Sequence, residues 1–220
     1  MAIVSLCNYA SPAVAYEREY LLFESKQPEN VTELDAEIKR EHLVLLGMTL
    51  GENTLPEVKQ RFGPAEQIRV GHDGVLICYR SVQNADNTVV VFGADIHGDQ
   101  RLINFQLVAN QQSFKGKEQC APSPLVSKEA ATKSGLKLGL NAGTVKKIWD
   151  APMIEKDGHL LLEYDYNKTT TYEGQPACLR VFSGSVTRFV EDKLAWLLIT
   201  RGTEGYPGRC LEKNTSPTSR

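Results

Sequence analysis

The sequence predicts an α+β fold of two tandem repeats, each a short helix or helix pair packed on an antiparallel β-meander. The observation behind this prediction is one pattern that occurs twice. A Gly turn precedes a short helix that ends near Pro, and an Asp-Gly hairpin with Tyr in its second strand follows. The copies span residues 46–79 and 138–164. We therefore expect each copy to form one supersecondary unit that buries its own apolar face.

The first helix is predicted from the residues at its ends. Thr54 and Glu57 form a capping box, and Pro56 suits the first turn, where its missing N–H removes no hydrogen bond. Gly63 accepts the left-handed conformation that ends a helix, so the helix should span 55–62. Its apolar residues share one face, which we expect to lie on a sheet. They are Leu55, Val58 and Phe62.

The strands of the first copy follow from turn residues and from β-branched residues. A hairpin is predicted over 68–80, with its turn at Asp73 and Gly74. Further strands are predicted at 88–92 and 102–108, because both segments are rich in Val, Ile, Leu and Phe. The first copy should therefore place one helix on an antiparallel meander.

The second copy repeats this order with different spacers. Asn141 is the predicted N-cap of a helix that ends before Pro152. Strands are predicted at 160–166, 177–182 and 193–199. Between the first two of these strands we expect a polar loop over 167–176.

The chain divides, on this interpretation, into five parts. Composition marks the connecting parts, which are rich in Pro, Gly, Ser, Thr and Lys. The parts are a signal-peptide remnant at 1–15, the first repeat with an N-terminal extension at 16–110, a linker at 111–126, the second repeat at 127–201 and a flexible tail at 202–220.

Composition excludes several classes of partner. The chain has 220 residues and a formal net charge of -2, without the basic stripe that nucleic-acid binding requires. No apolar run approaches the roughly 18 to 20 residues that span a bilayer. We expect no nucleic-acid partner, no transmembrane segment and a monomeric protein.

The N-terminus favours export. Ala13 and Ala15 satisfy the small-residue rule of a signal-peptidase site, although no Lys or Arg lies near Met1 and the apolar run at 2–7 is short. We interpret 1–15 as the remnant of an export signal, which predicts a periplasmic or secreted protein. The alternative is an apolar N-terminus with no targeting role.

The cysteines support the same interpretation. Cleavage after Ala15 removes Cys7 and leaves an even number of cysteines, two in each repeat. Four cysteines allow three connectivities, and the simplest one closes each repeat with its own disulfide. The alternative is four buried reduced thiols. The predicted pairs are Cys78 with Cys120 and Cys178 with Cys210.

Motifs for catalysis and for metal binding are lacking in the sequence. None of the four histidines stands in a metal-ligand spacing, and neither a Gly-x-Ser-x-Gly elbow nor a phosphate-binding Gly-rich loop occurs. We therefore predict no catalytic residues, no metal and no cofactor.

Aromatic residues are the predicted binding residues. Tyr and Trp bury a large area with few rotatable bonds, which is why they dominate binding hot spots. Tyr164 and Tyr166 alternate on one predicted strand, Tyr172 lies in the predicted loop and Trp196 lies on the last strand. The alternative is that they are core residues of the sheet, above all Tyr164 and Trp196.

The motif residues resemble those of a known family. In the order Gly-Met-Thr, a helix with Val, Gly-Pro and Tyr, the chain is similar to small outer-membrane assembly lipoproteins of the SmpA/OmlA (BamE) type. In doubled form, with one disulfide per copy, it resembles the β-lactamase inhibitory protein fold. The duplication and the lack of a convincing lipidated Cys depart from the lipoproteins, and the spacers depart from the inhibitor. The residues concerned are Gly47, Met48, Thr49, Val58, Gly63, Pro64 and Tyr79, and more loosely Gly139, Leu140, Val145, Pro152 and Tyr164.

The resemblance implies an exported bacterial α+β protein that binds another protein across its sheet or a hairpin loop. The favoured function is therefore a protein-binding module, either inhibitor-like or an accessory of envelope assembly, that acts through its sheet face and loops. The alternatives are an envelope-associated hydrolase or other enzyme with an unrecognised site, and a structural scaffold.

Overall fold

A computed structural model describes residues 33–34, 36–96, 98–109, 119–156, 159–172, 174–208 and 210. Within these residues, neither α-helix has the length or apolar character needed to cross a bilayer. The elements in chain order are β1 (Glu33–Leu34), the 3-10 helix η1 (Arg40–Leu43), β2 (Val44–Leu45), β3 (Met48–Thr49), α2 (Leu55–Phe62), β4 (Ile68–Val70), β5 (Gly74–Ser81), β6 (Val89–Asp95), β7 (Leu102–Val108), β8 (Ala121–Ser123), α3 (Ala142–Trp149), β9 (Ile154–Lys156), β10 (His159–Tyr172), β11 (Gln175–Val190) and β12 (Lys193–Pro207).

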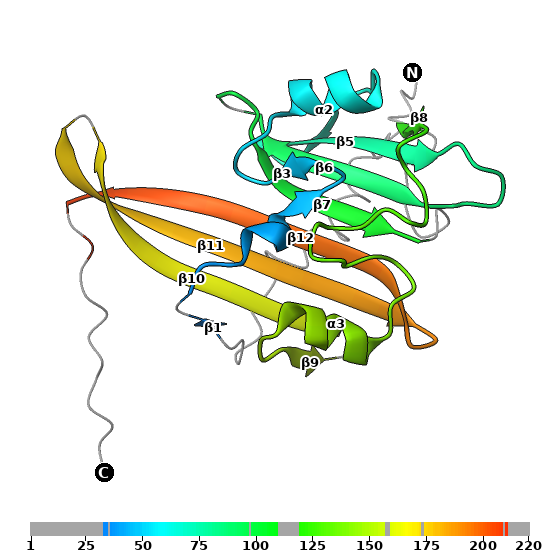
Figure 1. The fold of residues 1–220 in the computed structure, drawn as a ribbon. Helices are drawn as coiled ribbons and strands as arrows, with labels where there is room; N and C mark the ends of the chain where they lie inside the picture. Colours follow the sequence, from blue (N-terminus) through cyan, green and yellow to red (C-terminus); the bar gives the residue numbers. More distant parts are fainter. Residues whose placement is uncertain are drawn as a thin grey trace, which may run out of the picture.

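One continuous, twisted sheet runs through the molecule (Figure 1). Its strand order is β1-β10-β11-β12-β7-β6-β5-β4, with β8 paired to β5 and β9 paired to β10. All neighbours on this path are antiparallel except β1 and β10. The short strands β2 and β3 form a separate pair. The two halves of the chain therefore share one sheet, which is joined where β7 meets β12.

The predicted fold class is wrong. Among the described residues the chain is mostly β, with 52% strand and 13% helix, and a large antiparallel sheet replaces two helix-packed meanders. The α-helices are short, each of eight residues. The three strands β10 to β12 are long, because residues that were expected to form a loop and a tail pair as strands instead.

The local signals at the helix ends predicted α2 and α3 correctly. Thr54 and Glu57 form the predicted capping box, and Gly63 ends α2 with a φ of 104°. The Asn141 side chain accepts a hydrogen bond from the Thr144 N–H at 2.8 Å and so caps α3. The helix ends at Asp150, which adopts the left-handed conformation, two residues before the Pro that was expected to close it.

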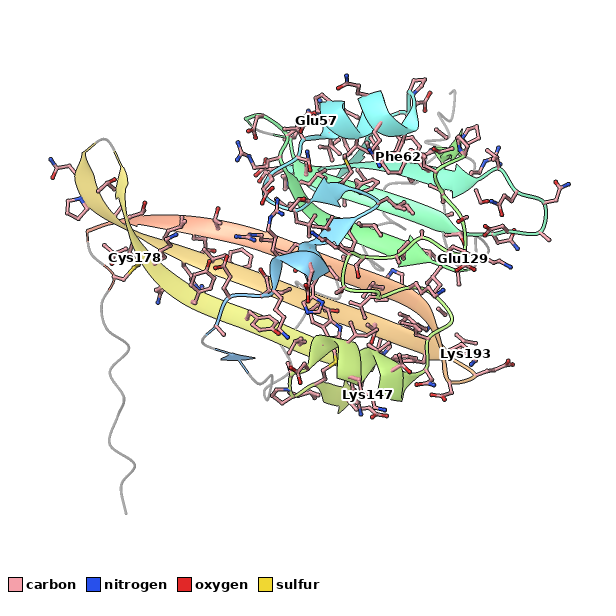
Figure 2. The ribbon with its side chains drawn as sticks, viewed as in Figure 1. Glu57, Phe62, Glu129, Lys147, Cys178 and Lys193 are labelled. Atoms are coloured by element: carbon pink, nitrogen blue, oxygen red, sulfur yellow. A yellow bond between two sulfur atoms is a disulfide. The ribbon has the colours of Figure 1, made fainter. Side chains whose placement is uncertain are left out.

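Both helices pack on the same face of the sheet. The main core is one cluster to which α2, α3 and the 38–50 segment contribute side chains. Lys147 lies on the solvent side of α3 (Figure 2). The largest fully buried side chains of the protein include Trp149, Tyr79, Phe92, Phe105, Leu43, Leu45, Leu50, Leu55, Ile77, Leu102, Leu107 and Leu136.

Tyr79 joins the first helix to the sheet. Its ring is fully buried, and its O–H donates to the carbonyl oxygen of Gly63, the residue that ends α2, at 2.8 Å. Burial raises the pKa of Tyr79 to about 12. The repeated Tyr of the sequence motif thus satisfies, in this copy, one of the carbonyl groups that a helix end leaves without an intrahelical partner.

A second, smaller apolar cluster lies on the opposite face. It surrounds the disulfide that joins Cys78 on β5 to Cys120, just before β8. The members of this cluster are Leu76, Cys78, Val89, Val91, Val108 and Cys120, with Ile68, Val70 and Trp196 packed against it.

Two of the segments that composition predicted to be connecting parts are partly folded in the structure. Of the predicted linker, residues 119–126 belong to the folded body, because β8 pairs with β5 and Val126 is fully buried. Of the predicted tail, residues 202–207 belong to β12. The predicted signal remnant at 1–15 and the rest of the linker lie outside the described residues.

His42 is a buried titratable group of the core. Its side chain is fully buried, its ring stacks on Trp149 with a centroid distance of 4.2 Å, and its Nδ1 lies 2.8 Å from Ser134 Oγ. Burial lowers the pKa of His42 to about 4, and the nearby Lys39 adds to this effect, whereas Glu41 opposes it. Between pH 6.5 and about 4, the imidazole is therefore mostly neutral in the folded protein and mostly protonated in the unfolded chain.

We expect acid to destabilise the protein through His42. The pKa of His42 is lower in the folded state than in the unfolded chain. Its contribution to the free energy of unfolding is therefore complete above pH 6.5, and up to about 3 kcal/mol of it is lost as the pH falls toward about 4. Urea unfolding followed by Trp fluorescence across this range measures the loss. His42→Phe keeps an aromatic ring against Trp149 but cannot titrate, so it should lack this pH dependence. Equal slopes for both proteins would contradict the prediction.

Candidate functional site

Three strands extend beyond the rest of the sheet. β12 pairs with β7 only from Trp196 to Thr200, whereas its pairing with β11 continues to Pro207. We call the part beyond Thr200 the arm, and it consists of residues 165–172, 174–182 and 201–207. Figure 1 shows it projecting from the body as a three-stranded ribbon. Neither α2 nor α3 covers it.

The arm begins where the first residues of β7 bond to the 51–55 loop and no longer to β12. The Leu102 N–H donates to the Asn53 carbonyl and the Gly51 N–H to the Leu102 carbonyl, each at 2.8 Å. The start of β7 is therefore held by the 51–55 loop, and β12 loses its neighbour on that side.

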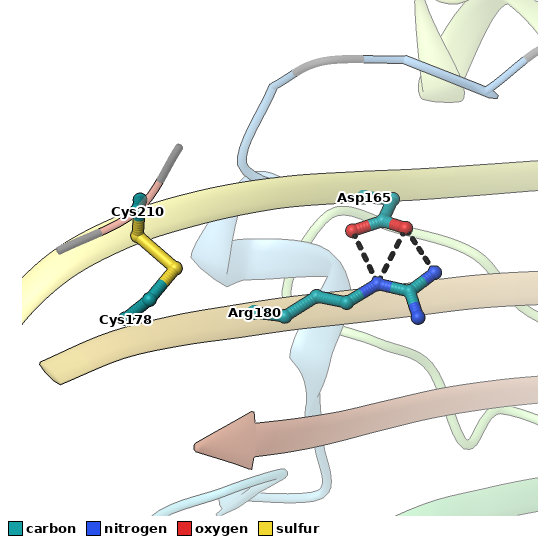
Figure 3. The surroundings of a disulfide bond; sticks show 4 residues. All are labelled: Asp165, Cys178, Arg180 and Cys210. Atoms are coloured by element: carbon teal, nitrogen blue, oxygen red, sulfur yellow. Dashed lines mark hydrogen bonds and ion pairs between the residues drawn. A yellow bond between two sulfur atoms is a disulfide. The ribbon is translucent and has the colours of Figure 1, made fainter. Parts of the chain in front are cut away.

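An ion-pair cluster crosses all three strands of the arm. Figure 3 shows its Asp165 and Arg180 side chains. Arg180 on β11 donates from Nε to both carboxylate oxygens of Asp165 on β10, at 3.1 and 2.8 Å, and its Nη2 also contacts Asp165. Its Nη1 lies 3.5 Å from an oxygen of Glu204 on β12. The Asp165 side chain is only 10% exposed, so this ion pair is largely shielded from water on the carboxylate side.

Phe182 lies beside this cluster, on the same face of the arm. It is the register partner of Gly202 on β12, and its ring lies directly over that glycine, since a Cβ built there would come within 2.1 Å of the ring. The ring nevertheless remains 38% exposed. Gly202 thus provides the space that holds an aromatic ring flat on the surface of the arm.

A disulfide closes the arm. Cys178 on β11 is bonded to Cys210, which follows the end of β12 (Figure 3). Cys178 lies well out along the arm (Figure 2). The bond therefore ties the far end of β12 to β11, where no other part of the described sheet supports it.

The opposite face of the arm is fastened to the body at its root. Arg201 Nη2 lies 3.4 Å from Glu37 Oε1, and its side chain packs against Gly51. Burial, and then a hydrogen bond with Glu37, raise the pKa of Tyr166. These contacts fix the angle at which the arm leaves the body.

An open depression lies between the root of the arm and the body. Its charged walls are largely paired internally, because Arg101 donates from Nε to Asp99 at 3.1 Å and Arg201 faces Glu37. Its apolar contribution comes from Ile103, an exposed side chain of β7. The lining residues are Asp95, Asp99, Arg101, Ile103, Arg201, Gly202 and Thr203.

The structure does not bring the four aromatic residues of the sequence prediction together. Tyr164 is buried in the main core, and Tyr166 is half-buried at the root of the arm on the same face. Trp196 lies on the opposite face and donates from Nε1 to Gln106 at 3.0 Å. Tyr172 ends β10 at the tip of the arm, and its side chain lies outside the described residues.

Sequence reasoning missed the residues that define the arm. Asp165, Arg180, Phe182 and Gly202 were part of predicted strands or of a predicted tail and received no role. The signal that could have found them is the alternation of charged or polar with apolar residues across 164–166 and 179–182, which predicts strands with two differently used faces.

The described residues of the arm combine ion pairs with an exposed aromatic side chain. Within the parts of the chain that the structure describes, no group of three or more His, Cys, Asp or Glu side chains is placed to hold a metal ion. Asp165, Arg180 and Glu204 of the arm are joined in ion pairs, and Phe182 is its exposed large apolar side chain.

Fold and site together define a mostly β protein with a disulfide-closed, projecting three-stranded arm. No protein-family model, no curated protein and no solved structure matches the chain.

Removing the carboxylate charge of Asp165 should destabilise the arm. We expect Asp165→Asn to lower the free energy of unfolding by about 1 to 2 kcal/mol, because Arg180 would keep its charge in a partly desolvated place without its main partner. Glu191→Gln is the matched control. It lies at the exposed turn that joins β11 to β12, at the end away from the arm, and should change stability little. Equal losses in urea unfolding for both variants would contradict this role.

Replacing Cys178 and Cys210 together by Ser should loosen the arm selectively. The bond spans 32 residues of sequence, and closing such a loop stabilises by about 3 to 4 kcal/mol in the chain-entropy account. Amide hydrogen exchange should accelerate in 175–180 and 203–207, and remain unchanged in β5 and β6. Uniform acceleration across the whole sheet would show that the bond does not act on the arm locally.

Proposed function

We propose that this protein is an exported binding module that engages another protein through its arm. The observation that carries the proposal is the arm itself, where an exposed Phe182 is held on a disulfide-closed ribbon that extends away from the core. Such a ribbon adds little to the core, because its outer residues are exposed on both faces. Rigid, exposed aromatic groups are the residues that dominate binding between proteins.

Two further observations support the proposal. Two disulfides in a chain of this size are typical of oxidising compartments, which favours a periplasmic or secreted location. The sequence resemblance to outer-membrane assembly lipoproteins and to the β-lactamase inhibitory protein, which implies binding to another protein, agrees with this function.

Site-specific crosslinking tests the proposal. A photoreactive phenylalanine analogue at position 182 of the full chain should capture a discrete partner from a periplasmic extract of the native host. The same analogue at Val190 is the matched control, because this residue lies on the same strand, is 52% exposed and sits at the other end of β11. Capture from both positions alike, or from neither, would contradict binding through the arm.

The captured partner then allows a quantitative test. Phe182→Ala should weaken its binding by about tenfold or more, since one central aromatic anchor contributes at least about 1.4 kcal/mol. Val190→Ala should leave the affinity unchanged. Both variants should retain the melting temperature of the parent, because both side chains are exposed.

A further inference from the structure

The outer edge of β12 carries hydrogen-bonding groups that point away from the arm. The Ala109 N–H donates to the Ala195 carbonyl, so the odd-numbered residues of β12 bond toward β7. At the other end, the Gly208 N–H donates to Pro176, so the even-numbered positions bond toward β11. By this alternation, Arg201, Thr203 and Gly205 lie on the side of β7. The Arg201 N–H belongs to the last register pair, Thr200 with Asn104, and donates to the Ile103 carbonyl. The groups that point outward without a strand beside them are therefore the Arg201 C=O and the N–H and C=O groups of Thr203 and Gly205.

No described strand occupies this edge. The pairing of β7 with β12 ends at Thr200, and within the described residues β12 has no other partner there than β11. Pro207 ends the edge, because it has no N–H to offer. The result is a short open edge from Arg201 to Gly205, in line with an existing strand of the same sheet.

The edge lies beside the depression at the root of the arm. Arg201, Gly202 and Thr203 of β12 line this depression together with Ile103 and Asp95 of the body. A single extended chain added at the usual strand spacing of about 4.8 Å would occupy this space. A second copy of the whole protein would have to bring its own sheet and loops into the same space, between arm and body.

The side chains around the edge define the chemistry of its occupant. The charges at the rim already have partners, since Arg101 faces Asp99 and Arg201 faces Glu37. Two exposed apolar side chains would lose contact with water when a partner binds. They are Ile103, which lines the depression, and Phe182, which lies over Gly202. The occupant should therefore be nearly neutral, with an aliphatic or β-branched side chain toward Phe182.

We infer that the edge of β12 from Arg201 to Gly205 binds an extended segment of a partner protein, which adds to the sheet as an antiparallel strand. The added strand continues the line of β7 beyond the point where the 51–55 loop redirects it. Backbone hydrogen bonds provide affinity, and Phe182 with Ile103 selects the side chain, as in other cases of strand addition. This inference rests on the proposed function and specifies how the partner is held.

Hydrogen exchange of the full chain tests the open edge in the unbound protein. We expect the amides of Thr203 and Gly205 to exchange roughly 100-fold faster than those of Leu197 and Ile199, which are bonded to β7. Equal protection of all four amides would overturn the inference, because it would mean that the edge is already occupied.

A peptide probe then tests binding. Random linear peptides of about ten residues, displayed on phage and selected on the full chain, should yield binders that protect the amides of Thr203 and Gly205. Selection of no binder, or of binders that protect other residues, would overturn the inference. A dimer seen by light scattering that Thr203→Pro dissociates would assign the edge to a second copy and would also overturn it.

Two variants with a matched control complete the test. Thr203→Pro removes the central outward N–H and leaves the bonding to β11 in place, and Ile103→Asp places a charge in the apolar wall. Each should weaken the selected peptide by about tenfold or more, whereas Leu125→Asp, the same change at another exposed apolar residue, should not. Ile103→Asp decides the outcome if Thr203→Pro fails to fold, and binding that survives Ile103→Asp overturns the inference.

The two proposals can fail separately. A partner that crosslinks at position 182 and is weakened by Phe182→Ala, but not by Thr203→Pro or Ile103→Asp, would support the arm as binding surface and overturn strand addition. Peptides that bind the edge while position 182 captures no partner would support strand addition and contradict the proposed partner surface.

Discussion

The pairing of β7 with β12 is the contact on which the rest of the structure depends. It extends only from Trp196 to Thr200, yet it joins the two halves into one sheet and supports a core on one face and the Cys78 cluster on the other. A side-chain hydrogen bond from Trp196 to Gln106 fastens the same two strands. Because the pairing stops at Thr200, the remainder of β12 can extend outward as part of the arm.

Local chemistry explains what could be predicted from the sequence. The ends of α2 are encoded by residues within a few positions of each other, Thr54 with Glu57 and then Gly63, so no knowledge of distant contacts is needed. The cap of α3 at Asn141 is equally local. The pairing of the cysteines followed from the division into two halves, and the structure contains both expected bonds.

The fold class and the site depended on distant contacts that leave no local pattern. The residues paired between β7 and β12 are about 90 positions apart, and nothing near Gln106 indicates Trp196 as its partner. The outer part of the arm at 167–176 was predicted to be a loop because 167–171 is polar. Residues 167–171 are exposed on both faces, so they lack the apolar alternation that marks a half-buried strand. The exposure of Phe182 depends on a glycine in another strand.

The strand order also governs when the molecule can be completed during synthesis. The first half, through β7, leaves the ribosome long before β12 exists, and until then its central edge is the unpaired edge of β7. β12 is synthesised last of the three long strands and lies between two strands that already exist, β11 and β7. The sheet is therefore completed by a strand in its middle. A nascent chain of this topology therefore carries an unpaired strand edge from the completion of β7 until β12 is made, and a holding chaperone would shield this edge from neighbouring chains.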